Sequence, residues 1–220
     1  MVIKNCPNLK SVNFDACKNL EKLVIENCPK LKRLQGYGCR IDELILNDFP
    51  DLTHVYVPFN RLRKLEIKDC EEIETLFCNN NNLKELDVSE LTQLKKLYCY
   101  RNMLETLDCS RASGLGELFA QGNGLKEIKL GVHPWLTHID LAENELKRLD
   151  VTRCKKLEIF SCRDNLLTDL DLSNNQRLTF LVISNNHFPP TDVEKLSHLS
   201  EMKDLIIGLH FANDVQKVPQ

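Results

Sequence analysis

The sequence predicts a mainly-β protein built as a solenoid of stacked coils. Three observations carry this prediction: the chain repeats with a regular period, each half-repeat alternates apolar and polar positions, and one asparagine recurs in seven successive repeats, after two early coils that have Cys17 and Cys39 in its place. Self-similarity at a period of about 20 to 50 residues is the signature of repeat architectures. A single coil cannot bury its own apolar edge, so neighbouring coils must stack to form a core.

Each repeat divides into a ten-residue half and an eleven-residue half. The first has the pattern LxxLx(L/C/I)xxNx, as in "LKKLYCYRNM" from residue 94, and the second has LxxLDLSxxxx, as in "LTDLDLSNNQR" from residue 167. The apolar-x-apolar centre of each half is too short for a helix and fits a strand of about three to five residues. Both halves are therefore expected to be extended.

Two polar columns run along the repeats. An internal polar residue needs hydrogen-bond partners, so the asparagines are predicted to be structural. The aspartates are interpreted as turn and strand-edge acceptors rather than as paired catalytic acids, and Lys129 interrupts their column. The asparagine column is Asn60, Asn81, Asn102, Asn123, Asn144, Asn165 and Asn186, and the aspartate column is Asp87, Asp108, Asp150 and Asp171.

These patterns over residues 9–188 resemble the leucine-rich repeat family, whose consensus begins LxxLxLxxNxL, and especially its short 21-residue bacterial and internalin-like repeats. The resemblance implies a right-handed solenoid. Its LxxLxC segments would form a parallel sheet on the concave face, and its LxxLDLS segments would form the opposite wall. It also implies that the asparagines form a ladder that bonds to the backbone of their own turn and of neighbouring coils.

The ends of the chain depart from this regularity. Residues 1–187 are predicted to be the repeat array, beginning mid-repeat because "VIKNCPNL" at 2–9 aligns with "VIENCPKL" at 24–31, as expected for a fragment of a longer polypeptide or for a bare first coil. Residues 188–220 are predicted to be an irregular final repeat and partial cap. There, Thr191 and Glu194 form a capping-box pattern before a short helix near 192–200. Met202, Leu205 and Ile207 then resume the strand spacing, with Leu205 in the column of Leu181.

Composition and charge argue against several functional classes. The 220 residues are 42% hydrophobic and 28% charged, with a net charge of −3. This balance lacks the basic character that binds nucleic acid. The sequence has neither a signal-peptide pattern nor about 18 consecutive apolar residues, so no membrane span is expected. Ten cysteines without a CxxC pair or a recognisable disulfide framework favour a reducing, cytoplasmic location.

The cysteines are predicted to be packing residues. Cys78, Cys99, Cys109 and Cys162 replace leucine, isoleucine or valine at inward positions, and Cys28, Cys70 and Cys154 share one corner column with Phe49, Leu91 and Ala112. Neighbouring cysteines would be about 5 Å apart, but parallel side chains are poorly oriented for a disulfide. No histidine completes a zinc set and no nucleophile is paired with a base, so we expect no metal, no cofactor and no catalytic residue.

The candidate binding site is a column of side chains that must point outward from the concave strands. Four consecutive coils place an aromatic residue there: Tyr56, Phe77, Tyr98 and Phe119. Exposed aromatics beside charges of both signs are typical of protein-binding surfaces, so a protein or peptide partner is expected. The flanking candidates are His54, Lys96, Tyr100, Arg101 and Glu117.

Other interpretations of this column and of the chain stay open. Aromatic ladders can serve only to stabilise the sheet through cross-strand pairs. The array could instead be a substrate-recognition or regulatory segment of a larger enzyme, or it could bind carbohydrate through its ring faces. An uncovered first coil would also allow end-to-end self-association.

Overall fold

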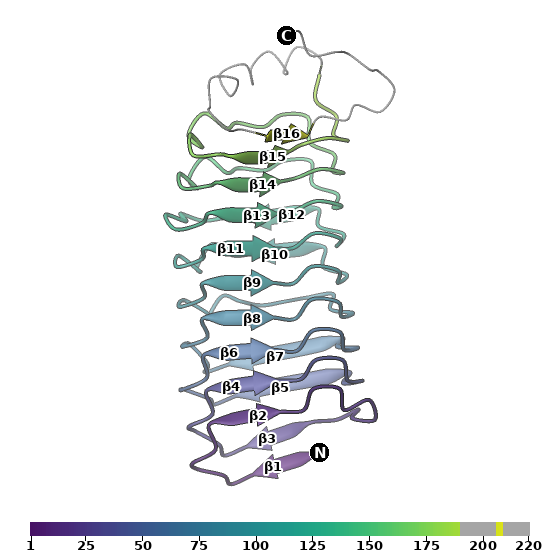
Figure 1. The fold of residues 1–220 in the computed structure, drawn as a ribbon, viewed down its shortest axis with the longest axis vertical. Coiled ribbons are helices and arrows are strands. Elements are labelled where there is room, and N and C mark those ends of the chain that lie inside the picture. Colours follow the sequence, from purple (N-terminus) through teal and green to yellow (C-terminus); the bar gives the residue numbers. More distant parts are fainter. Residues whose placement is uncertain (190–205, 209–220) are drawn as a thin grey trace.

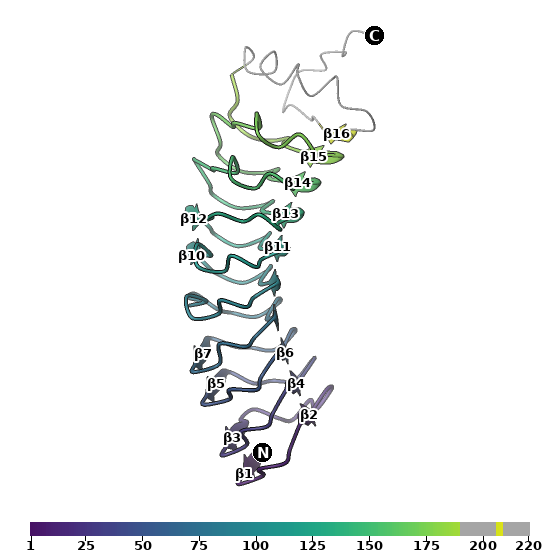
Figure 2. The same ribbon diagram turned by 90° about the vertical axis from the view of Figure 1, so that its left-hand side faces the viewer.

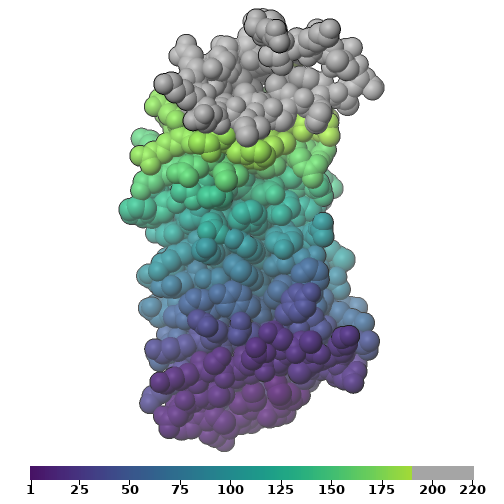
Figure 3. Space-filling view, viewed as in Figure 1, coloured from purple at the N-terminus to yellow at the C-terminus, as the bar shows by residue number. Residues whose placement is uncertain are grey.

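The computed structural model describes residues 1–189 and 206–208. The chain forms a parallel β-solenoid of about nine turns, whose coils rise in chain order from the purple N-terminus to the green and yellow coils in Figure 1. Figure 3 shows the same stack as one continuous column of packed atoms. The described residues contain no helix, so this part of the chain offers none that could cross a membrane.

One side of the stack is a ten-stranded parallel sheet, with one strand from each coil. Figure 2 shows it on the inner side of the curved stack, which confirms the predicted concave sheet. Ser11 pairs with Arg33 across the first repeat, which is one residue longer than the others. Arg33 pairs with His54, and every later strand pair up to β15 has the same separation in sequence as this pair. The strands are β2 (Ser11–Asn13), β4 (Arg33–Gln35), β6 (His54–Tyr56), β8 (Thr75–Phe77), β9 (Lys96–Tyr98), β11 (Glu117–Phe119), β13 (His138–Asp140), β14 (Ile159–Ser161), β15 (Phe180–Val182) and β16 (Ile206–Gly208).

The last strand corrects one prediction. Leu181 pairs with Ile207 instead of with the predicted Leu205. A shift of two positions leaves every side chain on the same face of the sheet, so apolar spacing alone does not determine this register. The helix predicted near 192–200 lies outside the described residues.

The opposite wall is extended but only partly regular. It contains β1 (Val2–Lys4), β3 (Val24–Glu26), β5 (Glu43–Asn47), β7 (Lys64–Lys68), β10 (Thr106–Asp108) and β12 (Glu127–Lys129), paired as three separate two-stranded parallel sheets. In its C-terminal part the predicted aspartates close turns. For example, Asp87 Oδ1 accepts the N–H of Ser89 at 2.9 Å, and hydrogen bonds from Ser89 lower the pKa of this carboxyl. Asp108, Asp150 and Asp171 accept in the same way from Ser110, Thr152 and Ser173.

We call the turn that follows each concave strand the asparagine corner. Asn102 Nδ2 donates to the carbonyl oxygens of Cys78 at 3.1 Å and Cys99 at 3.0 Å, and its Oδ1 accepts the N–H of Leu83 at 3.0 Å. Equivalent bonds are made by Asn60, Asn81, Asn123, Asn144, Asn165 and Asn186, which confirms the predicted ladder. In an early coil, Cys39 takes this place and its thiol donates to the carbonyl oxygen of Phe14 at 3.0 Å.

The turn that precedes each concave strand is the other corner, at the left edge of Figure 1. We call it the cysteine corner. Here the backbone closes the turn by itself: the N–H of Leu115 donates to the carbonyl oxygen of Ala112 at 3.0 Å, and the same three-residue spacing recurs in the other coils. The first residues of these turns are Cys6, Cys28, Phe49, Cys70, Leu91, Ala112, His133, Cys154 and Asn175.

A candidate protein-binding surface on the concave sheet

The four predicted aromatic residues form one continuous row of rings, which we call the aromatic stripe (Tyr56, Phe77, Tyr98 and Phe119). Ring centroids are 5.0 Å apart between Tyr56 and Phe77, 4.0 Å between Phe77 and Tyr98, and 4.6 Å between Tyr98 and Phe119. Adjacent strands in register bring these side chains together because alternate residues share a face of the sheet. The rings point out of the sheet as predicted, but they are half-buried.

A polar network holds the centre of the stripe in place. The Tyr98 hydroxyl donates to Glu117 Oε2, and Lys96 Nζ lies 2.7 Å from Glu117 Oε1. Burial and the bond to Glu117 raise the pKa of Tyr98. Burial alone would raise the pKa of Glu117, but hydrogen bonds from Lys96 and Tyr98 outweigh it and lower this pKa. Three of the predicted site residues therefore act as one unit.

The remaining predicted residues surround this centre without joining the network. His54 Nδ1 lies 2.7 Å from Thr53 Oγ1, and its ring centroid is 5.9 Å from that of Tyr56. Burial, followed by the positive charge of Arg33, lowers the pKa of His54. Tyr100 is half-buried, whereas Arg101 is exposed in the left-handed backbone region with a φ of 52°.

A second pair of rings was not predicted as part of the site. Tyr37 and Phe59 are 51% and 47% exposed, and their ring centroids lie 5.2 Å apart. Phe59 has a φ of 54°, in a column that glycine or asparagine fills in several other coils. A bulky residue in the left-handed region is uncommon and costs about 1–2 kcal/mol. A phenylalanine at a position that favours glycine is the sequence signal that could have identified this pair.

The stripe ends at Phe119. The next outward residue is Asp140, whose pKa is raised by burial, and Ser161 and Val182 follow in the next two coils. The outward column therefore has an aromatic part followed by a part with smaller side chains. The aromatic stripe itself spans the coils of β6, β8, β9 and β11.

Eight of the ten cysteines are buried, while Cys6 is half-buried and Cys17 is exposed. All ten are free thiols, and Cys78, Cys99, Cys109 and Cys162 are buried as predicted. Burial raises the pKa of Cys78 to about 12 and of Cys154 to about 11, so neither is a thiolate at neutral pH. In the described part of the chain, no group of three or more histidine, cysteine, aspartate or glutamate side chains could hold a metal ion.

Comparison with solved structures places this architecture among known folds. The functional domain of InlJ from Listeria monocytogenes, which includes a cysteine ladder, has a TM-score of 0.81 and 27% identity over 93% of this chain and 44% of its own. YopM, a leucine-rich effector protein from Yersinia pestis, has a TM-score of 0.60 and 28% identity over 84% of this chain and 60% of its own. The chain has the leucine-rich repeat fold.

A more distant leucine-rich repeat structure supports the same assignment of fold. Internalin C2 from Listeria monocytogenes has a TM-score of 0.56 and 18% identity over 77% of this chain and 81% of its own. Searches against protein-family models and curated proteins found no match. The chain spans less than half of the InlJ structure. The cysteines of the present chain are distributed over several columns of its repeats.

Proposed function

We propose that this leucine-rich repeat array is a non-catalytic scaffold that binds a protein or peptide partner on its concave sheet. The observation that carries the proposal is the aromatic stripe, joined to the Tyr98, Glu117 and Lys96 network. Clustered aromatics with fixed charged neighbours are the usual make-up of binding hot spots. Similarity to the functional domain of InlJ supports a role for the solenoid itself as a binding surface.

Ring geometry favours a protein partner over carbohydrate. Phe77 and Tyr98 stack with an interplanar angle of 10° at 4.0 Å, so each ring covers one face of the other. A sugar that stacks on an aromatic residue needs a free ring face, whereas an extended peptide can pack across ring edges and reach the Glu117 and Lys96 charges. The free thiols favour a reducing compartment, so the proposal places the protein in the cytoplasm.

The proposal is tested with a Tyr98→Ala and Phe119→Ala double variant. A pull-down from the native source, followed by titration calorimetry with the captured partner, should show affinity at least about thirtyfold weaker than wild type. Ser161→Ala, in the same outward column beyond the stripe, is the matched control and should bind normally. A double variant that loses melting temperature but keeps full affinity would show that the rings serve only to stabilise the sheet.

Two further measurements separate the alternatives. Tyr98→Phe keeps the ring but removes the hydroxyl that donates to Glu117, so its effect on affinity should be smaller than that of Tyr98→Ala. A glycan array gives no signal if the partner is a protein. Carbohydrate binding that Tyr56→Ala abolishes would overturn the proposal in favour of a sugar-binding surface.

A further inference from the structure

From segment 48–51 onward, the cysteine-corner edge carries its charges in two separate blocks, whereas the earlier corner segment 27–30 contains Lys30. In the N-terminal block, the corner segments 48–51, 69–72 and 90–93 contain acids and no bases. In the C-terminal block, segments 111–114, 153–156 and 174–177 contain lysine or arginine and no acids, and segment 132–135 contains neither acids nor lysine or arginine. The acids are Asp48, Asp51, Asp69, Glu71, Glu72 and Glu90. The bases are Arg111, Arg153, Lys155, Lys156 and Arg177.

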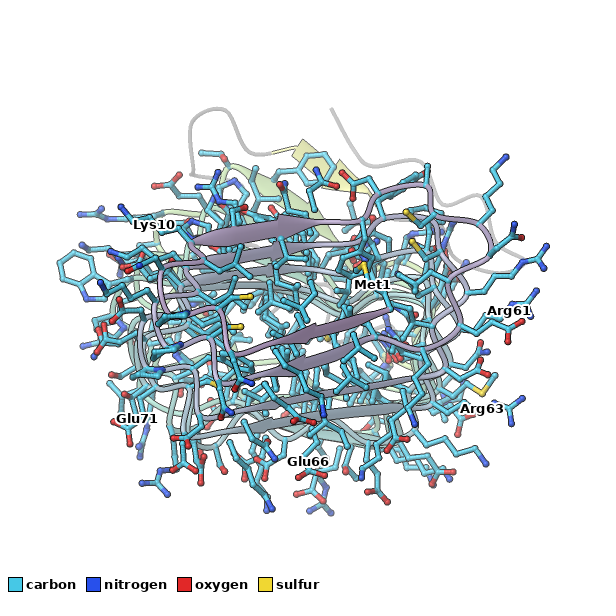
Figure 4. The ribbon with its side chains drawn as sticks, turned by 90° about the horizontal axis from the view of Figure 1, so that it is seen from below. Met1, Lys10, Arg61, Arg63, Glu66 and Glu71 are labelled. Carbon is cyan, nitrogen blue, oxygen red and sulfur yellow. The ribbon has the colours of Figure 1, made fainter. Side chains whose placement is uncertain are left out.

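These charges face solvent, and none of them forms an ion pair with another residue that the structure describes. All eleven are exposed except Lys156, which is half-buried. Figure 4 shows Glu71 projecting from this edge, on the opposite side of the stack from Arg61. Ion pairs elsewhere in the described residues, such as Lys64 with Glu66 at 2.9 Å, involve none of the eleven. The edge is therefore available to a charged surface of another molecule.

The two blocks are arranged symmetrically about one corner, Ala112 to Gly114. Segment 69–72 lies two coils before segment 111–114, and segment 153–156 lies two coils after it. The first has three acids and the second has three bases. At about 4.8 Å per coil, both lie about 10 Å from the central corner. Segment 48–51 is three coils away on one side, and segment 174–177, with Arg177, is three coils away on the other.

We propose that two copies of this chain associate side by side and antiparallel along the cysteine-corner edge, with a two-fold axis at Ala112 to Gly114. A two-fold interface uses the same surface patch on both partners, so that patch must be complementary to itself. Antiparallel pairing about this axis places each acidic segment opposite a basic segment or an uncharged one. Ala112, Ser113 and Gly114 have small side chains, which allows the two backbones to approach closely at the axis.

Exposed apolar groups on the same edge support an interface. Trp135 and Val132 are 59% and 56% exposed, and Lys156 Nζ lies 3.8 Å from the centre of the Trp135 ring. Tryptophan is enriched among residues that dominate binding energy. Both residues lie one coil beyond the axis, and in the dimer they meet segment 90–93 of the second copy, where Glu90 faces the Lys156 charge.

Electrostatics determines the expected behaviour of this dimer. Exposed ion pairs each contribute at most about 1 kcal/mol and are screened by salt. The association should therefore be weak, strengthen as ionic strength falls and depend on the pattern of charges. Because the edge is separate from the aromatic stripe, stripe variants should dimerise normally, so this inference can fail without affecting the proposed function.

Charge reversal gives the main test. Sedimentation equilibrium should show dimers at about 0.02 M salt and fewer at about 0.5 M. Glu71→Lys with Glu72→Lys leaves the edge predominantly basic, and Lys155→Glu with Lys156→Glu leaves it predominantly acidic, so each variant should dimerise at least about tenfold more weakly. An equimolar mixture of the two should form a heterodimer, and one chain with all four changes should form homodimers again. A wild-type chain that stays monomeric at low salt, or a mixture that does not associate, would overturn the proposal.

A cross-link tests the position of the axis. In a Cys6→Ser and Cys17→Ser background, Ser113→Cys places a thiol next to its own copy across the axis. With copper phenanthroline and oxygen as the oxidant, the two thiols lose two protons and two electrons and form an intermolecular disulfide. Thr92→Cys, in the same column one coil away, faces a different segment and should cross-link poorly. Stronger cross-linking at Thr92 than at Ser113 would rule out this axis.

Discussion

The two corners of each coil satisfy the hydrogen bonds of their backbone groups in different ways. At the asparagine corner, the N–H of Leu83 is bonded to a side chain, Asn102, which belongs to the next coil. At the cysteine corner, the backbone bonds to itself, as when the N–H of Leu157 donates to the carbonyl oxygen of Cys154 at 3.0 Å. Where a side chain completes the hydrogen bonding, asparagine recurs at every repeat from Asn60 to Asn186. Where the backbone completes it, cysteine, phenylalanine, leucine, alanine, histidine and asparagine are all present.

This difference means that the residue type at a corner is restricted more by the need to bond buried backbone groups than by burial of the side chain. Side chains at both corners are largely or fully buried, yet only one corner has a fixed sequence. Buried donors and acceptors without partners cost about 1–3 kcal/mol each, whereas apolar residues of different size can be accommodated by repacking. Four changes test this comparison.

Asn102→Leu should give the largest effect. It leaves the N–H of Leu83 without an acceptor and removes two bonds from the carbonyl oxygens of Cys78 and Cys99, which keep bonds from Asn81 and Asn123. One unpaired buried donor and two lost bonds predict a loss of about 3 kcal/mol of unfolding free energy, measured in urea. A loss below about 1 kcal/mol would contradict the argued role of this corner.

Acidification tests the histidine at the cysteine corner. His133 is fully buried, and its Nε2 accepts the N–H of Gly131 at 3.1 Å. Burial lowers the pKa of His133 below 6.5, although the backbone of Ala112 acts in the opposite direction. The unfolded chain then binds a proton that the folded chain does not, so stability should fall as pH decreases from about 6.5.

The comparison for this effect is His133→Leu, with unfolding measured at neutral pH and at mildly acidic pH. The variant should lose less stability on acidification than wild type. His54, whose pKa is also lowered, is present in both proteins and cancels in the difference. Equal pH dependence in the two proteins would show that His133 does not contribute.

Cys154→Ala should have a smaller effect. The thiol is fully buried, but the turn bond to Leu157 uses the backbone of residue 154 and survives the change. Only packing is lost, which predicts about 1 kcal/mol in urea unfolding. A loss as large as that of Asn102→Leu would mean that the cysteine side chain has a role beyond filling space.

Asn175→Leu should change stability least, or increase it by about 1 kcal/mol. Asn175 is the same residue type as Asn102 and is fully buried, and it donates to the carbonyl oxygens of Val151 and Cys154. Both oxygens already accept a backbone N–H, and Asn175 Oδ1 has no partner. Urea unfolding of Asn102→Leu and Asn175→Leu therefore compares the same substitution at the two corners. A similar loss of unfolding free energy in both variants would show that the corner does not determine the effect.

The regular part of the fold could be predicted from the sequence because it follows from the length of the repeat. The constant repeat spacing identified the asparagine ladder and the outward direction of Tyr98, and both depend only on backbone alternation and stacking. The half-burial of the stripe could not be predicted in this way, since it depends on how each ring turns toward its neighbour.

The other misses share one physical origin, because they occur where the repeat does not restrict the residue. His133 and Asn175 occupy a column in which the backbone closes the turn, so no pattern marks them as buried polar groups. The register of β16 follows a longer connection, and a shift of two positions preserves the apolar pattern. Phe59 was not predicted because the spacing of apolar residues does not show that its φ is positive, although other coils have glycine or asparagine in its column.

The direction of the asparagine bonds gives the array a polarity. Asn102 bonds to its own coil and to residues before it in the chain, such as Cys78 and Leu83, so each coil is completed by the one that follows. A cut between two coils would create two chemically different ends. The C-terminal piece would keep its asparagines, while the N-terminal piece would end on a buried N–H without an acceptor. The first asparagine of the C-terminal piece would keep the bond to its own coil but lose the carbonyl oxygen and the N–H of the preceding coil, so the two ends need different partners.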